Sequence, residues 1–197
     1  MKSRLVVCAS GEGTTFESIV KATRDGRLEA DVVGLIVNRP KIGALGRAAR
    51  LNVPTKILSA KSFTNRMRWD EALLEQLQEW RADYVVLAGF LALIGAKTLK
   101  AFPQKIVNSH PALLPKHGGH GMYGIKVHEA VIAARESESG VTIHLIDERY
   151  DRGKILAQTK VSVPGDADAL EAAVKRVESE FYPRVLNDLV TGRITTG

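Results

Sequence analysis

Short apolar runs alternate with helix-like segments, and this alternation constrains the fold of the chain more than any other feature. Residues 4–10 (RLVVCAS) and 31–38 (DVVGLIVN) are the first two runs, and the segment between them has a helical pattern. The alternation continues with a helix near 43–51, a strand at 54–59, a helix at 63–80, a strand at 83–90, a helix near 95–101 and a strand at 105–110. Strands that are apolar on both faces and alternate with helices are typical of a parallel sheet with helices on both faces. We therefore expect a doubly wound α/β fold.

The last part of the chain predicts an antiparallel edge to this sheet. Residues 140–163 contain two longer strands joined at a polar turn around 151–153. This pattern indicates a β-hairpin or two adjacent antiparallel strands. A final helix begins at Asp168, with Glu171 completing a capping box, and Thr14 caps the first helix in the same way.

The composition is that of an ordinary globular protein. Hydrophobic residues make up 45% and charged residues 25% of the chain, so we expect a single domain over residues 1–197. The N-terminal apolar run is too short for a signal peptide, and no run approaches the roughly 18 apolar residues of a membrane span. We expect a cytoplasmic protein with no membrane partner. The only cysteine, Cys8, lies in an apolar run, which favours a buried thiol over a nucleophile.

The charge is moderately basic. The chain has 28 Lys and Arg and 22 Asp and Glu, a net charge of +6. Such a balance admits either nucleic acid or small anionic substrates such as phosphates and carboxylates. The basic residues are scattered rather than clustered, which favours small anions over nucleic acid.

A glycine-rich turn follows the first strand, in the segment SGEGTTFES of residues 10–18. The amides at the start of the next helix can bind a phosphate there. The segment is neither a dinucleotide fingerprint, because Phe16 replaces the third glycine, nor a P-loop. A monophosphate site and a turn that merely needs glycines both remain open.

Two polar side chains end the strand at 105–110. Asn108 and His110 are two residues apart and therefore project from the same face, whereas Ser109 points away. The carboxyl ends of strands are where ligands bind in open α/β sheets. An amide and an imidazole together can stabilise an oxyanion and move protons. The alternative is a histidine that only caps a loop.

A segment rich in glycine and histidine, residues 116–124, follows this strand. His117 and His120 raise the possibility of a metal site, but no cysteine or carboxylate accompanies them at ligand spacing, so we expect no metal. A mobile loop over the site fits the glycines better. Further along, His144 faces away from its apolar neighbours on the predicted strand. Three carboxylates follow it, at Asp147, Glu148 and Asp151, and spacing alone does not decide which of them serves His110.

Five segments together resemble a known family. SGEGTT, VVLAGFLALI, IVNSHPALLP, GVTIHLIDERYDRGKIL and VESEFYP stand in the order found in the phosphoribosylglycinamide formyltransferases. These belong to the 10-formyltetrahydrofolate-dependent formyltransferase superfamily, which has a Rossmann-type fold. The similarity covers nearly the whole chain. It implies transfer of a formyl group from 10-formyltetrahydrofolate to the amine of glycinamide ribonucleotide in purine biosynthesis, without a metal, by a monomer or homodimer.

The resemblance also implies roles for individual residues. It makes Asn108, His110 and Asp151 the catalytic group, with a protonated His110, and His144 a supporting group. The implied substrate-binding residues are Gly11, Gly13, Thr14 and Thr15 at the phosphate and Glu178 at the ribose, and the implied folate-binding residues are Arg66, Leu87, Gly89, Phe90, Leu91 and Asp147. Ala92 stands where many members have arginine or another polar residue, and the loop after Pro115 is longer and richer in glycine than usual.

Other functions share parts of this pattern. Methionyl-tRNA formyltransferases and formyltetrahydrofolate deformylases have the same catalytic group but normally carry a further domain, so we expect neither. A formyltransferase acting on a sugar nucleotide or another amine remains an alternative. A non-catalytic module that binds phosphate is a second alternative, although it would have no use for Asn108, His110 and Asp151.

Overall fold

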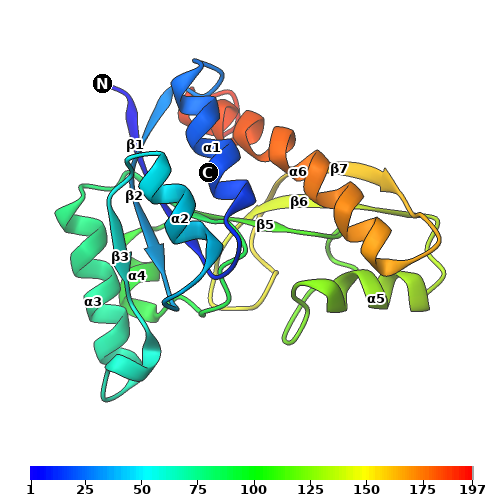
Figure 1. The fold of residues 1–197 in the computed structure, drawn as a ribbon, viewed down its shortest axis with the longest axis horizontal. Helices are drawn as coiled ribbons and strands as arrows, with labels where there is room; N and C mark the ends of the chain where they lie inside the picture. Colours follow the sequence, from blue (N-terminus) through cyan, green and yellow to red (C-terminus); the bar gives the residue numbers. More distant parts are fainter. Residues whose placement is uncertain (197) are drawn as a thin grey trace.

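Seven strands form one sheet in the order β3-β2-β1-β4-β5-β6-β7 in the computed structural model, which describes residues 1–196 (Figure 1). The strands are β1 (Ser3–Ala9), β2 (Ala30–Val37), β3 (Thr55–Ile57), β4 (Tyr84–Leu87), β5 (Ile106–His110), β6 (Glu138–Leu145) and β7 (Ile155–Ser162). The first five strands are parallel, and β6 and β7 extend the sheet antiparallel to their neighbours. This confirms the doubly wound α/β fold with an antiparallel edge.

Helices cover both faces of the sheet. They are α1 (Thr14–Arg24), α2 (Gly43–Arg50), α3 (Arg66–Glu79), α4 (Ala96–Ala101), α5 (Ile125–Ala133) and α6 (Ala167–Val190), with a short 3₁₀ turn at Ala60–Ser62. The helices α1, α2, α5 and α6 contribute to one hydrophobic core, and α3 packs into a second core on the other face. Figure 1 shows α6 running beside both α1 and α5. Side chains of odd-numbered residues of β1, such as Val7, face the first core, and those of even-numbered residues, such as Val6, face the second.

The first helix begins at Thr14 as predicted, but the predicted caps of two helices differ from the structure. Thr14 is the first residue of α1 rather than its cap, because Gly13 occupies the cap position with a left-handed backbone (φ 75°). Glu17 does not reach back to the helix start and instead forms ion pairs with Lys21 and Arg47. The cap of α6 is Asp166 rather than Asp168, since its side chain accepts a hydrogen bond from the amide of Ala169.

The structure also contains a helix that the sequence analysis did not predict. Residues 125–133 form α5, although the glycine-rich run before them indicates only a long loop. The signal was present, because Val127 and Val131 are four residues apart and both are buried on one face of the helix. The loop itself therefore ends at Gly124.

A single tyrosine of α6 reaches the middle of the sheet. The Tyr182 side chain is fully buried, and its hydroxyl donates to the carbonyl of Val107 (2.9 Å) and lies 3.3 Å from that of Leu87. These carbonyls belong to the neighbouring strands β5 and β4 near their carboxyl ends. The chain order reverses between β1 and β4, and α/β folds bind ligands beside such a reversal.

Candidate active site

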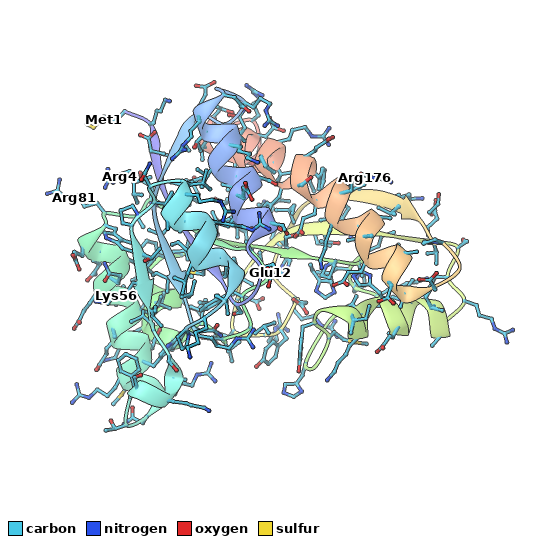
Figure 2. The ribbon with its side chains drawn as sticks, in the orientation of Figure 1. Met1, Arg4, Glu12, Lys56, Arg81 and Arg176 are labelled. Atoms are coloured by element: carbon cyan, nitrogen blue, oxygen red, sulfur yellow. The ribbon has the colours of Figure 1, made fainter. Side chains whose placement is uncertain are left out.

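A cavity of about 480 Å³ opens at the carboxyl ends of β1, β4 and β5. Its volume is typical of a pocket for a small molecule. Its walls come from the β1–α1 turn, where Figure 2 labels Glu12, and from the segments after β4, β5 and β6 and the first half of α6. The predicted site residues that line it are Gly11, Gly13, Thr14, Thr15, Leu87, Gly89, Phe90, Leu91, Asn108, His110, Asp147, Asp151 and Glu178. His144 and Arg66 stand outside this lining.

His144 lies next to Asn108, on the side away from the cavity. The two residues are paired across β5 and β6, and the amide nitrogen of Asn108 is 3.0 Å from Nε2 of His144. The other ring nitrogen of His144, Nδ1, is 2.9 Å from the carbonyl oxygen of Leu145. A carbonyl only accepts, so Nδ1 carries the hydrogen and Nε2 accepts from Asn108. The imidazole of His144, which is fully buried, thus orients the amide of Asn108 toward the cavity.

His110 and Asp151 face each other at the cavity wall. Nδ1 of His110 lies 3.7 Å from Oδ2 of Asp151, and Nε2 of His144 lies 3.6 Å from the other carboxylate oxygen. The carboxylate is held by the amide of Gly119, which donates to Oδ2 (2.9 Å). Of the three carboxylates that follow β6, Asp151 is therefore the one beside His110.

The charge state of His110 depends on two opposing effects. Its side chain is almost completely buried, which lowers the pKa of the imidazole, whereas the Asp151 carboxylate raises that pKa. Burial is the larger effect. The imidazole is therefore expected to be mainly neutral at pH 7 in this state, in contrast to the imidazolium expected from the resemblance. Its Nε2 donates to the carbonyl of His117 (2.8 Å), so Nε2 carries a hydrogen in either charge state.

The turn between β1 and α1 presents the start of a helix to the cavity. The first amides of α1, around Thr14 and Thr15, have no partner within the helix and can bind an anion. Gly13 is required by packing as well as by its backbone, since a Cβ there would lie 2.7 Å from Cα of Ala44 on α2. A Cβ at Gly11 would instead meet no atom within 4 Å.

Glu178 of α6 lies against this turn. Its carboxylate accepts a hydrogen bond from the hydroxyl of Thr15 (3.0 Å). Burial raises the pKa of the Glu178 carboxyl, and the nearby hydroxyls of Ser109 and Thr15 act in the opposite direction. The helix start and this carboxylate therefore form one continuous polar wall.

The segment after β4 forms an apolar wall on the other side of the cavity. Leu87 and Phe90 are buried at its base, while Leu91 is half exposed at the opening. The hydroxyl of Ser10 accepts from the amide of Leu91 (2.9 Å), which ties this segment to the end of β1. Arg66 stands behind the wall, where its guanidinium donates to the carbonyl of Leu93 (3.1 Å).

The two histidines of the glycine-rich loop do not converge on one point. Nε2 of His117 lies 3.6 Å from the carboxylate of Glu136, whereas His120 packs edge-on against Tyr150. Within residues 1–196, no group of three or more His, Cys, Asp or Glu side chains is arranged to hold a metal ion. Cys8 is fully buried, and burial raises the pKa of its thiol, which disfavours a nucleophilic thiolate.

The cavity also contains residues that the sequence analysis missed. His128 of α5 lines it with a side chain that is only 2% exposed, and its Nδ1 has no hydrogen-bond partner among the described residues. Glu171 and Lys175 of α6 line the same region and pair with each other (2.9 Å). Recognition of α5 from its apolar spacing would have placed His128 on the buried face, one residue after Val127.

Comparison of the sequence with known protein families shows the class to which this chain belongs. The formyl transferase family matches residues 3–186, and the chain belongs to this family. This confirms the resemblance found in the sequence. No helix in the described part of the chain, residues 1–196, has the length and apolar character needed to cross a membrane.

Within this family, the chain is similar to several named proteins and solved structures. Phosphoribosylglycinamide formyltransferase of Haemophilus influenzae is 33% identical over 193 residues, which cover 97% of this chain and 89% of that protein. The chloroplastic phosphoribosylglycinamide formyltransferase of Vigna unguiculata is 38% identical over 195 residues. The match covers 98% of this chain but only 62% of the length of that relative. The crystal structure of glycinamide ribonucleotide transformylase 1 from Geobacillus kaustophilus is 40% identical, with a TM-score of 0.90 over 96% of this chain and 100% of that one.

Proposed function

We propose that this chain transfers the formyl group of 10-formyltetrahydrofolate to the amino group of glycinamide ribonucleotide, a step of purine biosynthesis. The observation that carries the proposal is the convergence of Asn108, His110 and Asp151 in one cavity beside the N-terminus of α1. Membership of the formyl transferase family supports the reaction type, and the names of the relatives support the acceptor. A cytoplasmic location is part of the proposal.

The two substrates would occupy opposite walls of the cavity. The phosphate of the ribonucleotide is assigned to the amides around Thr14 and Thr15, and its ribose to Glu178. The formyl-folate is assigned to the apolar wall of residues 87–91, with its pterin near the loop at 147–151. Arg66 would act on the folate only through the backbone of that wall, since its side chain donates to a carbonyl behind it. This arrangement would bring the amine and the formyl carbon together in front of Asn108 and His110.

The reaction needs no covalent bond to the protein. The amine attacks the formyl carbon, a carbon–nitrogen bond forms, and the carbonyl electron pair moves to oxygen to give a tetrahedral intermediate. The bond from carbon to N10 of the folate then breaks, and the proton lost by the amine ends on N10. Asn108 and Nε2–H of His110 would donate hydrogen bonds to the oxyanion, and such donors act most strongly where charge develops.

His110 would change its charge state during the reaction. A negative charge on the substrate oxygen raises the pKa of an adjacent imidazole, and Asp151 already favours the imidazolium. The proton would be taken up from solvent at Nδ1, which faces Asp151, as the oxyanion forms, and it would be released again when the intermediate collapses. The protonated His110 expected from the resemblance would thus form with the intermediate rather than precede it. The hydrogen bond from Nε2 to the carbonyl of His117 must break first, because the oxyanion needs the same donor. The loop that carries His117 would therefore move when substrate binds.

An assay with several acceptors tests the proposed function. Purified protein is mixed with 10-formyltetrahydrofolate and with glycinamide ribonucleotide, methionyl-tRNA, an amino-sugar nucleotide or water alone, and release of tetrahydrofolate is followed. We expect turnover with glycinamide ribonucleotide only. Faster turnover with the amino-sugar nucleotide would support the alternative acceptor, and folate binding without any turnover would support a non-catalytic module.

Two histidine variants provide the control. His110→Ala removes the group placed at the reacting atoms and should abolish most of the turnover. His120→Ala changes an exposed histidine on the loop, whose ring contacts Tyr150 and does not line the cavity, and it should leave the acceptor preference unchanged.

A further inference from the structure

Three polar side chains lie together on the wall of the cavity to which α6 contributes. Thr15 comes from α1, Ser109 from β5 and Glu178 from α6, and all three line the cavity. Ser109 lies on the face of β5 opposite to Asn108 and His110, on the same side as the buried Val107. It is therefore separate from the group assigned to the oxyanion.

Among residues 1–196, the hydroxyl of Ser109 meets no partner in the geometry of a hydrogen bond. The residue is 7% exposed, and its Oγ is one of few buried polar side-chain atoms within residues 1–196 that lack a partner. The hydroxyl is near enough to lower the pKa of Glu178, yet it completes no hydrogen bond with it. A buried hydroxyl without a partner is unfavourable, so its position at a cavity wall points to a ligand that supplies the partner.

The chemistry of the three groups defines that ligand. A carboxylate only accepts hydrogen bonds and repels anions, so the ligand atoms that reach Glu178 must be donors and not phosphate oxygens. Thr15 already donates to Oε2, which leaves the other carboxylate oxygen of Glu178 for a ligand. A serine hydroxyl both donates and accepts. An alcohol group matches both partners, and two neighbouring alcohol groups would satisfy Ser109 and Glu178 together.

The position of this wall agrees with a pentose phosphate. Thr15 takes part in two subsites at once, because its amide belongs to the helix start and its hydroxyl holds Glu178. The alcohol-binding wall therefore adjoins the anion-binding turn directly. A ribose 5-phosphate unit carries its phosphate and its 2′- and 3′-hydroxyls on one ring, within a few bonds of each other.

We propose that Ser109 is a specificity-determining residue whose hydroxyl forms a hydrogen bond with a ribose hydroxyl of the acceptor substrate, next to the hydroxyl held by Glu178. The inference rests on the proposed function, because it assigns a contact to the ribonucleotide that the chain would formylate. It adds a second polar contact to the ribose and predicts that the site distinguishes ribose from deoxyribose.

Binding measurements on a serine variant test this contact. The Kd of glycinamide ribonucleotide, and of its 2′-deoxy and 3′-deoxy analogues, is measured by calorimetry without folate for the wild type and for Ser109→Ala. We expect Ser109→Ala to raise the Kd of the ribonucleotide about fivefold, the usual net effect of one hydrogen bond. One of the two deoxy analogues should bind both proteins equally well, because it lacks the alcohol that Ser109 contacts.

Ser139 offers a matched control. It is a second serine whose buried hydroxyl has no partner, it is 2% exposed on β6, and it does not line the cavity. Ser139→Ala should leave every Kd unchanged. Ser139→Ala should also leave the thermal unfolding midpoint unchanged, since it removes a hydroxyl that has no partner among residues 1–196.

Two results would overturn the inference. One is a Ser109→Ala protein that binds the ribonucleotide as tightly as the wild type, and the other is an equal loss for the ribonucleotide and both deoxy analogues, which would mean that Ser109 acts only through Glu178. If the wild type formylates glycinamide ribonucleotide in either case, the proposed function stands without this contact. A wild type that neither binds nor formylates the ribonucleotide would overturn both.

Discussion

The amide nitrogen of Asn108 lies 3.0 Å from Nε2 of His144, its partner across β5 and β6. One N–H of the amide is thus used to hold the side chain, and the second is left for a ligand oxygen. A preformed donor of this kind needs no rearrangement when negative charge develops on the substrate. In the proposed mechanism His144 would accordingly be a positioning residue that acts on the reaction through Asn108.

Variants of this pair should reveal both roles. Asn108→Ala removes the proposed oxyanion donor, so we expect kcat to fall roughly 10²- to 10³-fold. The KM values should change little, because the donor acts mainly on the transition state. His144→Ala should lower kcat less, since the amide remains. The double variant should lose less than the product of the two single losses, and fully multiplicative losses in kcat would argue against a shared role.

His110 and Asp151 should control the pH dependence of formyl transfer. His110→Ala should lower kcat on the order of 10²-fold or more. The Asp151 carboxylate raises the pKa of His110, so Asp151→Asn should move the pKa of that imidazole further down. If the imidazolium takes part in the rate-limiting step, kcat declines as the pH rises through this pKa, and the decline begins at lower pH in Asp151→Asn. Profiles of kcat against pH that coincide for both proteins, apart from a constant factor, would exclude this role of Asp151.

The glycine turn allows a direct test of the anion site, although not at Gly13. A side chain at Gly13 would collide with the backbone of Ala44, so a Gly13→Val protein would report packing rather than crowding of a phosphate. Gly11 has open space around it. Gly11→Val should therefore raise the KM of the ribonucleotide about tenfold and leave the KM of the folate nearly unchanged. Gly165→Val, also in open space but outside the cavity lining, is the control, and equal changes in both KM values for Gly11→Val would refute this placement.

Buried histidines should make the stability of the protein depend on pH. Burial lowers the pKa of His110, His128 and His144. The unfolded chain then binds more protons than the folded protein around the ordinary histidine pKa of 6.5, so the free energy of unfolding falls as the pH falls through this value. Urea unfolding at about pH 7.5 and about pH 5.5 measures the change.

Substitution of His128 alone tests the contribution of one histidine to this pH dependence. His128→Gln removes one imidazole with a lowered pKa, so it should reduce the loss of stability between the two pH values, whatever its effect on stability at neutral pH. The exposed His120→Gln is the control and should follow the wild type. A His128→Gln protein with an unchanged difference between the two pH values would contradict the assignment.

Much of the fold, and the shared face of Asn108 and His110, can be predicted from the sequence because both follow from the regular spacing of side chains along helices and strands. Asn108 and His110 share a face since side chains of a strand alternate, and the same rule places Ser109 opposite. The choice of Asp151 among three carboxylates does not follow from spacing. It depends on a loop that turns back through a left-handed backbone at Asp151 (φ 52°) and is held by the amide of Gly119.

Other parts of the site depend on packing between distant segments. His128 enters the cavity because α5 packs on α6, and the glycines before α5 hide the helix in the sequence. The caps of α1 and α6 lie one and two residues before the predicted ones, because the left-handed Gly13 and the side chain of Asp166 take the cap positions. Local preference alone does not distinguish these from the neighbouring Thr14 and Asp168.

The hydroxyl of Tyr182 ties α6 to β5 beside the cavity. Tyr182 stands one helical turn after Glu178 on α6, and it donates to the carbonyl of Val107, the residue before Asn108. The same turn of helix therefore connects the proposed ribose wall to the backbone that carries the proposed oxyanion donor, Asn108. The span between the proposed sugar end and the proposed reacting end of the cavity is thus fixed at the backbone of α6 and β5 by a buried ring. The protein would thus select its acceptor by the distance between the sugar hydroxyls and the amine. In a substrate that is longer or shorter by one bond, the amine nitrogen would be out of line with the formyl carbon.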